Sequence, residues 1–269
     1  MRRFQGTLLI SDCDGTLLNS NRETPFNNIE AIRYYTAYGG LFVLATGRPK
    51  NGARHILEQF PDYHAPAVFF NGALICGIPT GKILLADPIG TDVVQIAKCI
   101  QCKFPSIGLE AFTLDQALIL RDSEVTRYHF QILQEPPVFA LPEQLPSKGV
   151  LKLFATGERT ALEEVREYLL RTYPDILNAV LSSDIFLEIF SRTSNKGSAL
   201  TALKQLYPEI RRVYAVGDND NDIPMLQKAD LAFIPANGTA QAKACGVPVC
   251  SCDDGALSDV LTHLDQLHT

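Results

Sequence analysis

Three short apolar runs along this chain share one pattern. They are TLLIS at residues 7–11, LFVLA at residues 41–45 and VYAV at residues 213–216. Each run is aliphatic or β-branched without regular polar alternation, which is typical of strands that are covered on both faces in a parallel sheet. Polar residues follow each run immediately. Because ligands bind beyond the carboxyl ends of parallel strands, we expect these polar residues to form the functional site.

Helical patterns connect the apolar runs. After the first run, Thr24 is suited to cap a helix, Pro25 suits its first helical position, and the glycine pair at residues 39–40 can end it. A second helix is predicted after Ser194, a candidate N-cap, and it leads into the third run. Both segments are βαβ units. We therefore expect an α/β fold with a Rossmann-like parallel-sheet core.

The middle of the chain has a different pattern. Helices are predicted over residues 92–103 and 159–172, among β-rich pieces such as the alternating DIFLEIF. Mixed helices and strands between two halves of a parallel-sheet domain predict an inserted α+β cap. We assign residues 1–82 and 185–269 to the core and residues 83–184 to the cap.

Composition and charge exclude several classes of partner. The 269 residues carry a formal net charge of −6, and Lys and Arg are scattered along the chain, which argues against nucleic acid or an anionic membrane. The first residues hold too few apolar side chains for a signal peptide, and no run of about 18 apolar residues occurs, so we expect a cytoplasmic protein. The seven cysteines are widely spaced and odd in number, so reduced thiols are expected.

Acidic residues follow the first and third runs. Asp12 and Asp14 come directly after the first run, and Asp218 and Asp222 come after the third. Carboxylates that share a pocket repel each other unless a cation neutralises one of them or a proton is held between them. A few carboxylates together with substrate oxygens suit Mg²⁺ better than a calcium cage. The sequence therefore predicts a Mg²⁺ site at this edge of the sheet.

Phosphate-binding donors are expected at the same edge. The second run is followed by the Thr46 hydroxyl, the Gly47 amide and the Arg48 guanidinium. Lys196 lies near a predicted helix start, where free N–H groups and the helix dipole favour an anion. A small phosphorylated substrate is the partner that this set would bind.

Four segments in order, DCDGTLL, ATGR, NKGSALTAL and GDNDND, resemble the signature motifs of the haloacid dehalogenase (HAD) superfamily. The resemblance is specifically to its Cof-type phosphatases, in which a large cap follows the second motif. It covers roughly residues 5–75 and 185–260, whereas the cap is similar only in size and position. The resemblance implies a Mg²⁺-dependent phosphomonoester hydrolase for a sugar phosphate or a cofactor phosphate, with substrate specificity residing in the cap.

The resemblance also implies roles for the four acids. Asp12 would be the nucleophile that becomes an aspartyl phosphate, and Asp14 would protonate the leaving alkoxide and then deprotonate water. A carboxylate oxygen of Asp12, the backbone carbonyl of Asp14 and the side chain of Asp218 would hold Mg²⁺, with support from Asp222.

The phosphoryl group of the substrate would have its own binding residues. Amide, hydroxyl and ammonium donors position the transferring oxygens, and Asn221 orients groups nearby. The implied set is Thr46, Gly47, Arg48, Lys196 and Asn221. Asn71, in the segment FFNGALI, either faces the substrate or forms an Asn-Gly turn between two strands.

Two other functions are open on the sequence. A phosphomutase of the phosphomannomutase type would use the same core but needs a second phosphate site in the cap. The cap offers Arg121, Arg127, Lys148 and Lys152 without a tight cluster, so hydrolysis is favoured. A non-catalytic binding module would lack at least one of the acids or the lysine, and none is missing. The sequence does not define the particular substrate or the oligomeric state.

Overall fold

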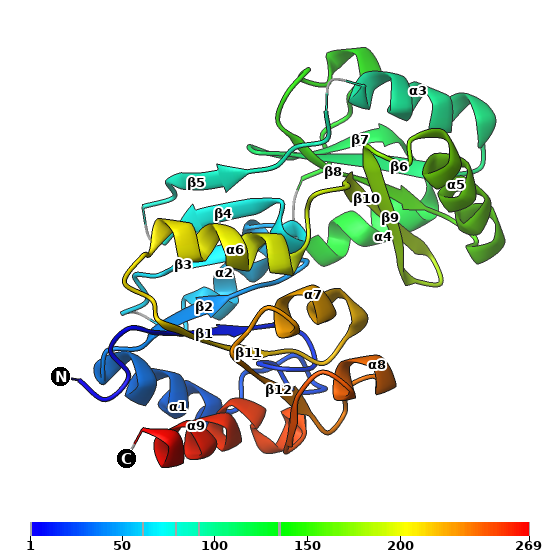
Figure 1. The fold of residues 1–269 in the computed structure, drawn as a ribbon. Helices are drawn as coiled ribbons and strands as arrows, with labels where there is room; N and C mark the ends of the chain where they lie inside the picture. Colours follow the sequence, from blue (N-terminus) through cyan, green and yellow to red (C-terminus); the bar gives the residue numbers. More distant parts are fainter. Residues whose placement is uncertain (1, 61, 79, 91, 134–135, 269) are drawn as a thin grey trace. The chain divides into compact units, whose positions relative to one another are not determined.

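The computed structural model describes residues 2–60, 62–78, 80–90, 92–133 and 136–268. The chain divides into two compact units (Figure 1). The first unit comprises Met1–Leu85 and Asn195–Thr269, and the second comprises Ala86–Ser194. The second unit is thus an insertion within the first.

The first unit is built on a five-stranded parallel sheet with the strand order β13-β12-β11-β1-β2. The strands are β1 (Thr7–Ser11), β2 (Leu41–Leu44), β11 (Arg212–Val216), β12 (Leu231–Pro235) and β13 (Val247–Val249). The three apolar runs are therefore neighbouring strands, as predicted. Ser11 pairs with Leu44 on one side and with Val216 on the other, so the carboxyl ends of these three strands are aligned.

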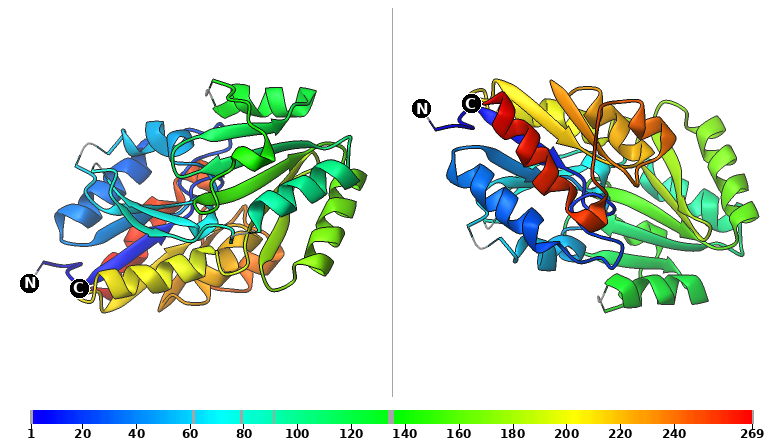
Figure 2. Two further views of the ribbon diagram at one scale, coloured as in Figure 1. Left: turned by 90° about the horizontal axis from the view of Figure 1, so that it is seen from above. Right: turned by 90° about the horizontal axis from the view of Figure 1, so that it is seen from below.

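Helices cover both faces of this sheet. They are α1 (Phe26–Ala37), α2 (Arg54–Leu57), α6 (Lys196–Leu206), α7 (Ile223–Leu226), α8 (Ala240–Lys243) and α9 (Ala256–Leu267). Helices α1 and α9 pack against each other on one face, and α6 and α7 lie on the opposite face (Figures 1 and 2). Leu8 and Ile10 of β1 share an apolar cluster with Leu200 and Leu203 of α6, which holds α6 against β1.

A second small sheet continues from β2. It has the order β3-β4-β5, with β3 (Pro66–Phe69), β4 (Leu74–Gly77) and β5 (Ile83–Ala86). Val68 of β3 forms a parallel bridge with Ala45, so β3 extends the edge of the main sheet. Phe70 and Asn71 both have positive φ, 52° and 54°, at the turn into β4. Asn tolerates this left-handed conformation better than most residues.

The second unit is an antiparallel five-stranded sheet with the order β7-β6-β8-β10-β9. Its strands are β6 (Gly108–Thr113), β7 (Ala117–Arg121), β8 (Val150–Thr156), β9 (Leu177–Ser183) and β10 (Phe186–Ser191), and its helices are α3 (Val93–Lys103), α4 (Glu124–Leu133) and α5 (Arg159–Thr172). Apolar side chains of α3 and α5, including Ile96 and Val165, share one core with Leu153 of β8. Five 3₁₀ turns complete the described elements: η1 (Asn51–Ala53), η2 (Phe70–Gly72), η3 (Pro142–Gln144), η4 (Asp220–Asp222) and η5 (Cys252–Asp254).

The boundaries of the second unit differ from the predicted 83–184. Strand β10 pairs with β8 on one side and β9 on the other, so the unit continues to Ser194. It begins at Ala86 because β5 belongs to the small sheet of the first unit. Across the described ranges, no helix is both long enough and apolar enough to cross a membrane.

The start of helix α6 corrects one expectation. Asn195, rather than Ser194, is the N-cap: its side-chain oxygen accepts the backbone N–H of Ser198 at 2.8 Å. Asn is among the strongest N-cap residues, and its side chain is placed to satisfy one of the unpaired amides of the first turn. The Ser194 hydroxyl instead donates to Asp87.

Candidate active site

Three carboxylates converge beyond the carboxyl ends of β1 and β11. Asp12 follows β1, Asp218 follows β11, and Asp222 ends the short turn η4. One oxygen from each side chain lies within 4.8 Å of the other two. The Asp12 N–H donates to the carbonyl of Val216 at 2.9 Å, which continues the pairing of the two strands into the site. We call these three residues the acid cluster.

Lys196 joins two members of the acid cluster. Its side chain leaves the first turn of α6 and has no exposed surface. The ammonium donates to Asp222 Oδ1 at 2.6 Å and also to Asp12 Oδ1. The structure therefore brings Lys196 into contact with two of the acids that the sequence places at the same edge of the sheet. A lysine this deeply buried requires paired acceptors, and it has two carboxylates.

Hydrogen bonds hold the loops that carry the acids. Asp222 Oδ2 accepts the backbone N–H groups of Asp218 and Asn219, both at 3.0 Å. The Thr16 hydroxyl donates to Asp218 Oδ1 at 2.9 Å. Gly15 has φ of +78°, and a Cβ there would lie 2.6 Å from Asp218 Oδ2, so only glycine allows this approach. These contacts hold the carboxylates of Asp218 and Asp222 in place.

The site carries an excess of negative charge. With all groups ionised, the acid cluster and Lys196 have a formal charge of −2. Burial raises the pKa of Asp12 well above its ordinary value, with Asp222 and Asp218 adding to the rise. Burial also raises the pKa of Asp218. Burial alone would lower the pKa of Lys196, but Asp12 and Asp222 outweigh it and raise that pKa.

This donor set fits a divalent cation. Hard carboxylate oxygens grouped within 4.8 Å suit Mg²⁺, and two positive charges would balance the excess. A cation would also reverse the rise in the pKa of Asp12, since an opposite charge favours the ionised carboxylate.

Asp14 lies outside the acid cluster. Its carboxylate is half-exposed and forms a bidentate pair with Arg48, with Nε–Oδ2 at 2.9 Å and Nη2–Oδ1 at 2.5 Å. Arg48 Nη1 also donates to the carbonyl of Gly52 at 3.1 Å. The hydrogen bonds that Arg48 donates to Asp14 raise the pKa of Arg48 above its ordinary value. Asp14 and Arg48 are thus paired with each other, and the Asp14 side chain is not a member of the acid cluster.

The second motif lies at the end of β2, next to the small sheet. Thr46 is fully buried, and its hydroxyl accepts the N–H of Arg48 at 3.1 Å. A Cβ on Gly47 would come within 3.1 Å of the Asn71 amide group. Asn71 Oδ1 accepts a hydrogen bond from Asn221 Nδ2 at 3.0 Å. Asn71 therefore joins the turn after β3 to the loop that carries Asp218 and Asp222, in addition to forming the turn.

Two residues of the site lie outside the predicted set. Thr16 holds Asp218, and Asn195 caps the helix that begins with Lys196. Both carried a signal in the sequence, since Thr16 follows the strand-end acids in DCDGT and Asn is a preferred N-cap.

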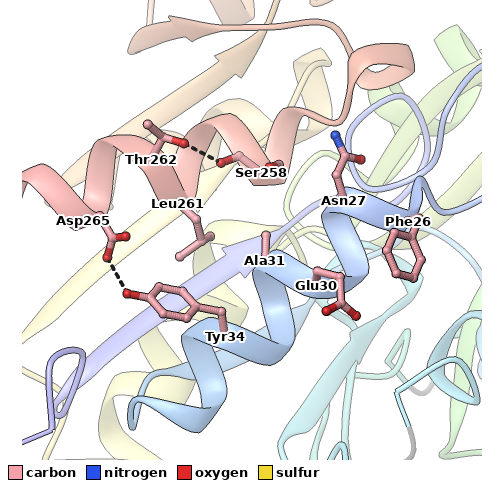
Figure 3. A pocket seen from close by; sticks show the side chains of 9 residues that line it. All are labelled: Phe26, Asn27, Glu30, Ala31, Tyr34, Ser258, Leu261, Thr262 and Asp265. Atoms are coloured by element: carbon pink, nitrogen blue, oxygen red, sulfur yellow. Dashed lines mark hydrogen bonds between the residues drawn. The ribbon is translucent and has the colours of Figure 1, made fainter.

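A separate surface pocket of about 390 Å³ lies between α1 and α9 (Figure 3). Phe26, Leu261 and Tyr34 are among its lining residues, and Tyr34 donates to Asp265 at 3.0 Å. None of the nine residues that line it belongs to the acid cluster. The grouped carboxylates and the buried lysine, rather than this pocket, mark the site with catalytic potential.

The fold and the site together define an α/β enzyme with a carboxylate–lysine centre and an inserted α+β unit. A family model described as haloacid dehalogenase-like hydrolase matches residues 9–255, and the chain belongs to this family. The order of its motifs and its large insertion place it in the Cof-type branch, as the sequence indicates.

Individual relatives and structures agree with this assignment. The chain is 27% identical over 242 residues to M6_Spy0533 of Streptococcus pyogenes serotype M6, covering 88% of this chain and 89% of the relative. It is 27% identical over 271 residues to the HMP-PP phosphatase of Cronobacter sakazakii, covering 96% and 95%.

Solved structures share the fold. A haloacid dehalogenase-like hydrolase from Bacteroides thetaiotaomicron matches with a TM-score of 0.85 and 19% identity, covering 97% of this chain and 99% of that one. TM0651 from Thermotoga maritima matches with a TM-score of 0.82 and 24% identity, covering 97% of each chain. The HAD subclass IIB sugar phosphatase BT4131 matches with a TM-score of 0.82 and 20% identity, covering 96% and 99%.

Proposed function

We propose that this chain is a Mg²⁺-dependent phosphomonoester hydrolase that acts on a small phosphorylated metabolite through an aspartyl phosphate on Asp12. The observation that carries the proposal is the acid cluster with Lys196, which has no exposed surface and contacts both Asp12 and Asp222. The phosphatase class follows from membership of the family and from the relatives and solved structures that are named as phosphatases.

The proposed chemistry starts at the Asp12 carboxylate. One of its oxygens forms a bond to phosphorus while the bond from phosphorus to the ester oxygen breaks, and the alkoxide leaves. Water then attacks the phosphorus of the aspartyl phosphate, which releases inorganic phosphate and restores Asp12. Lys196 holds Asp12 in one orientation through its hydrogen bond, and Asp222 holds Lys196. Positioning of this kind is a large part of catalysis in phosphoryl transfer.

Asp12, Asp218 and the backbone carbonyl of Asp14 would hold Mg²⁺, with Asp222 in support. When bound, Mg²⁺ supplies positive charge that offsets the repulsion between the nucleophile and the phosphate dianion. The two positive charges of Mg²⁺ would balance the formal charge of −2 that the acid cluster and Lys196 carry together.

Asp14 is the proposed proton donor and acceptor. It gives a proton to the leaving alkoxide and later takes one from the attacking water. Because Arg48 donates two hydrogen bonds to its carboxylate, Asp14 must leave this pair in order to act. We propose that Arg48 keeps the Asp14 carboxylate in this ion pair until substrate binds.

The transferred phosphoryl group is proposed to bind at the ends of β2 and α6. Three groups would contact its oxygens: the Thr46 hydroxyl, the Gly47 amide and the Lys196 ammonium. Asn221 would orient this region through its hydrogen bond to Asn71. The second unit is proposed to select the leaving group. A cytoplasmic location is proposed from the odd number and wide spacing of the seven cysteines.

The alternative of a phosphomutase receives no support from the second unit. Arg121 donates to the backbone carbonyls of Gln101 and Phe104, and Arg127 pairs with Asp122. Lys152 pairs with Glu188. Three of the four cations that the sequence offers for a second phosphate site thus have other partners.

The test is phosphate release from a panel of sugar phosphates and cofactor phosphates, with Mg²⁺ and with excess EDTA. Asp12→Asn should abolish release while its circular dichroism spectrum and unfolding midpoint remain close to those of the wild type. An active Asp12→Asn variant contradicts the covalent scheme. An isomerised product without release of phosphate would favour the mutase instead.

A further inference from the structure

The two segments that connect the units of this chain are tied to each other by one carboxylate. The chain passes between the units after Leu85 and again after Ser194. Asp87 lies just beyond the first passage, and its Oδ2 accepts hydrogen bonds from Thr193 Oγ1 and Ser194 Oγ, both at 2.7 Å. Its Oδ1 accepts a longer one from Ser191 Oγ at 3.3 Å.

The hydroxyl of Ser194 depends on this carboxylate. Ser194 is 1% exposed, and a buried hydroxyl is costly unless it is hydrogen-bonded. Besides the 2.7 Å bond to Oδ2, it lies 3.4 Å from the backbone carbonyl of Asp87. A hydrogen bond to an ionised acceptor is stronger than one between neutral groups. Asp87 therefore fixes the position of Ser194.

Ser194 lies just before the helix start that carries Lys196. The next residue, Asn195, is the N-cap of α6, and its backbone and side chain make reciprocal hydrogen bonds with Ser198 at 2.8–3.1 Å. Lys196 follows and places its ammonium on Asp12 and Asp222. One residue thus separates the hydroxyl held by Asp87 from Lys196.

We propose that Asp87 is a positioning residue for the reaction. By holding Ser194, it fixes the entry of the chain into α6 and so the point from which Lys196 reaches Asp12. The kinetic consequence rests on the proposed function, because it assumes that Lys196 orients the nucleophile. A displacement of about 1 Å in such a group can lower the rate by about 100-fold.

The experiment compares Asp87→Ala, Asp87→Asn, Ser194→Ala and the double variant Asp87→Ala/Ser194→Ala. Asp115→Ala, which removes an exposed acid from another loop of the same unit, is the control. We expect kcat of Asp87→Ala to fall about tenfold, within the range of such displacements, while KM changes less than about twofold. The kcat of Asp87→Asn should lie between those of Asp87→Ala and the wild type. The kcat of the double variant should fall no further than that of the more impaired single variant.

A second measurement does not require activity. The backbone N–H of Ser198 is protected by Asn195, so its hydrogen exchange reports on the N-cap. Asp87→Ala and Ser194→Ala should accelerate this exchange, and Asp115→Ala should not. If the wild type hydrolyses no phosphate ester, the proposed function fails, but the exchange still decides whether Asp87 orders the start of α6. Unchanged exchange, or a lowered unfolding midpoint with normal kcat, would overturn the proposal.

Discussion

Lys196 and Asp222 form an ion pair that is completely shielded from solvent, with 2.6 Å between Nζ and Oδ1. They come from the start of α6 and from the loop after β11, and Asp12 at the end of β1 is the second acceptor of the same ammonium. Transfer of such charges out of water is costly, and a buried pair is weak evidence of a gain in stability. We infer that the pair is retained for the chemistry of Asp12.

Removal of the ammonium should destabilise the fold strongly. Lys196→Met keeps an unbranched stem but leaves buried carboxylates without their cation, and breaking a buried pair in this way costs about 3–5 kcal/mol. We expect a decrease of this size in the free energy of unfolding, measured with urea in EDTA, together with loss of turnover. Lys204→Met, at an exposed position of the same helix, is the control. A variant as stable as the wild type would contradict this account of the pair.

Mg²⁺ should stabilise the folded protein even in the absence of substrate. A ligand that binds only the folded state adds about 2.7 kcal/mol at 100 times its Kd. We therefore expect Mg²⁺ to raise the unfolding midpoint of the wild type and excess EDTA to abolish both this rise and turnover. Asp218→Asn should weaken the rise, whereas Asp175→Asn, an exposed acid in the second unit, should not. Full turnover in EDTA would refute the assignment of the metal site.

The sequence predicts the features that depend on local pattern. The apolar runs at 7–11 and 213–216 became the paired strands β1 and β11, and the helix predicted over 159–172 is α5 (Arg159–Thr172). The approach of Asp12 to Asp218 was also predictable, because polar residues after adjacent parallel strands meet at one edge of the sheet.

Features that depend on distant partners were not predictable from pattern. Whether Asp14 turns toward the acids or toward Arg48 depends on side chains 34 positions apart. The bond between Asp87 and Thr193 joins residues 106 positions apart, and no periodicity encodes it. The end of the inserted unit was misplaced because β10 has an alternating pattern that fits any half-buried strand, and only its partners show to which sheet it belongs.

Asp14→Asn should impair catalysis in proportion to the basicity of the leaving group. An alkoxide needs a proton as it departs, whereas p-nitrophenolate is stable without one. We expect turnover of an alkyl phosphate to fall about 100-fold or more, within the usual contribution of a general acid, and that of p-nitrophenyl phosphate to fall much less. Equal losses on both substrates would exclude Asp14 as the proton donor.

The stability of the second unit should depend on the ionisation of Glu110. This side chain on β6 is fully buried, and its Oε2 lies 2.7 Å from His129 Nδ1, while Oε1 has no hydrogen-bond partner among the described residues. Burial raises the pKa of Glu110 above the ordinary value of 4.5, and the hydrogen bond with His129 opposes the rise only in part. The folded state therefore holds the proton of Glu110 to higher pH than the unfolded state does.

The sign of the pH dependence follows from this difference. Well below pH 4.5 the carboxyl is protonated in both states, so its contribution to stability is fully present. Between pH 4.5 and the folded pKa, the carboxyl is ionised in the unfolded state but still protonated in the folded state. The free energy of unfolding therefore falls over this interval by at most about 1.4 kcal/mol per pH unit, and the contribution is lost once the pH has passed the folded pKa. The side chain of Glu110→Gln cannot ionise. This part of the decline should therefore be absent from its free energy of unfolding, measured with urea across the same pH range. Glu167→Gln, an exposed glutamate on α5, should keep the wild-type slope, and an unchanged slope in Glu110→Gln would show that another group controls it.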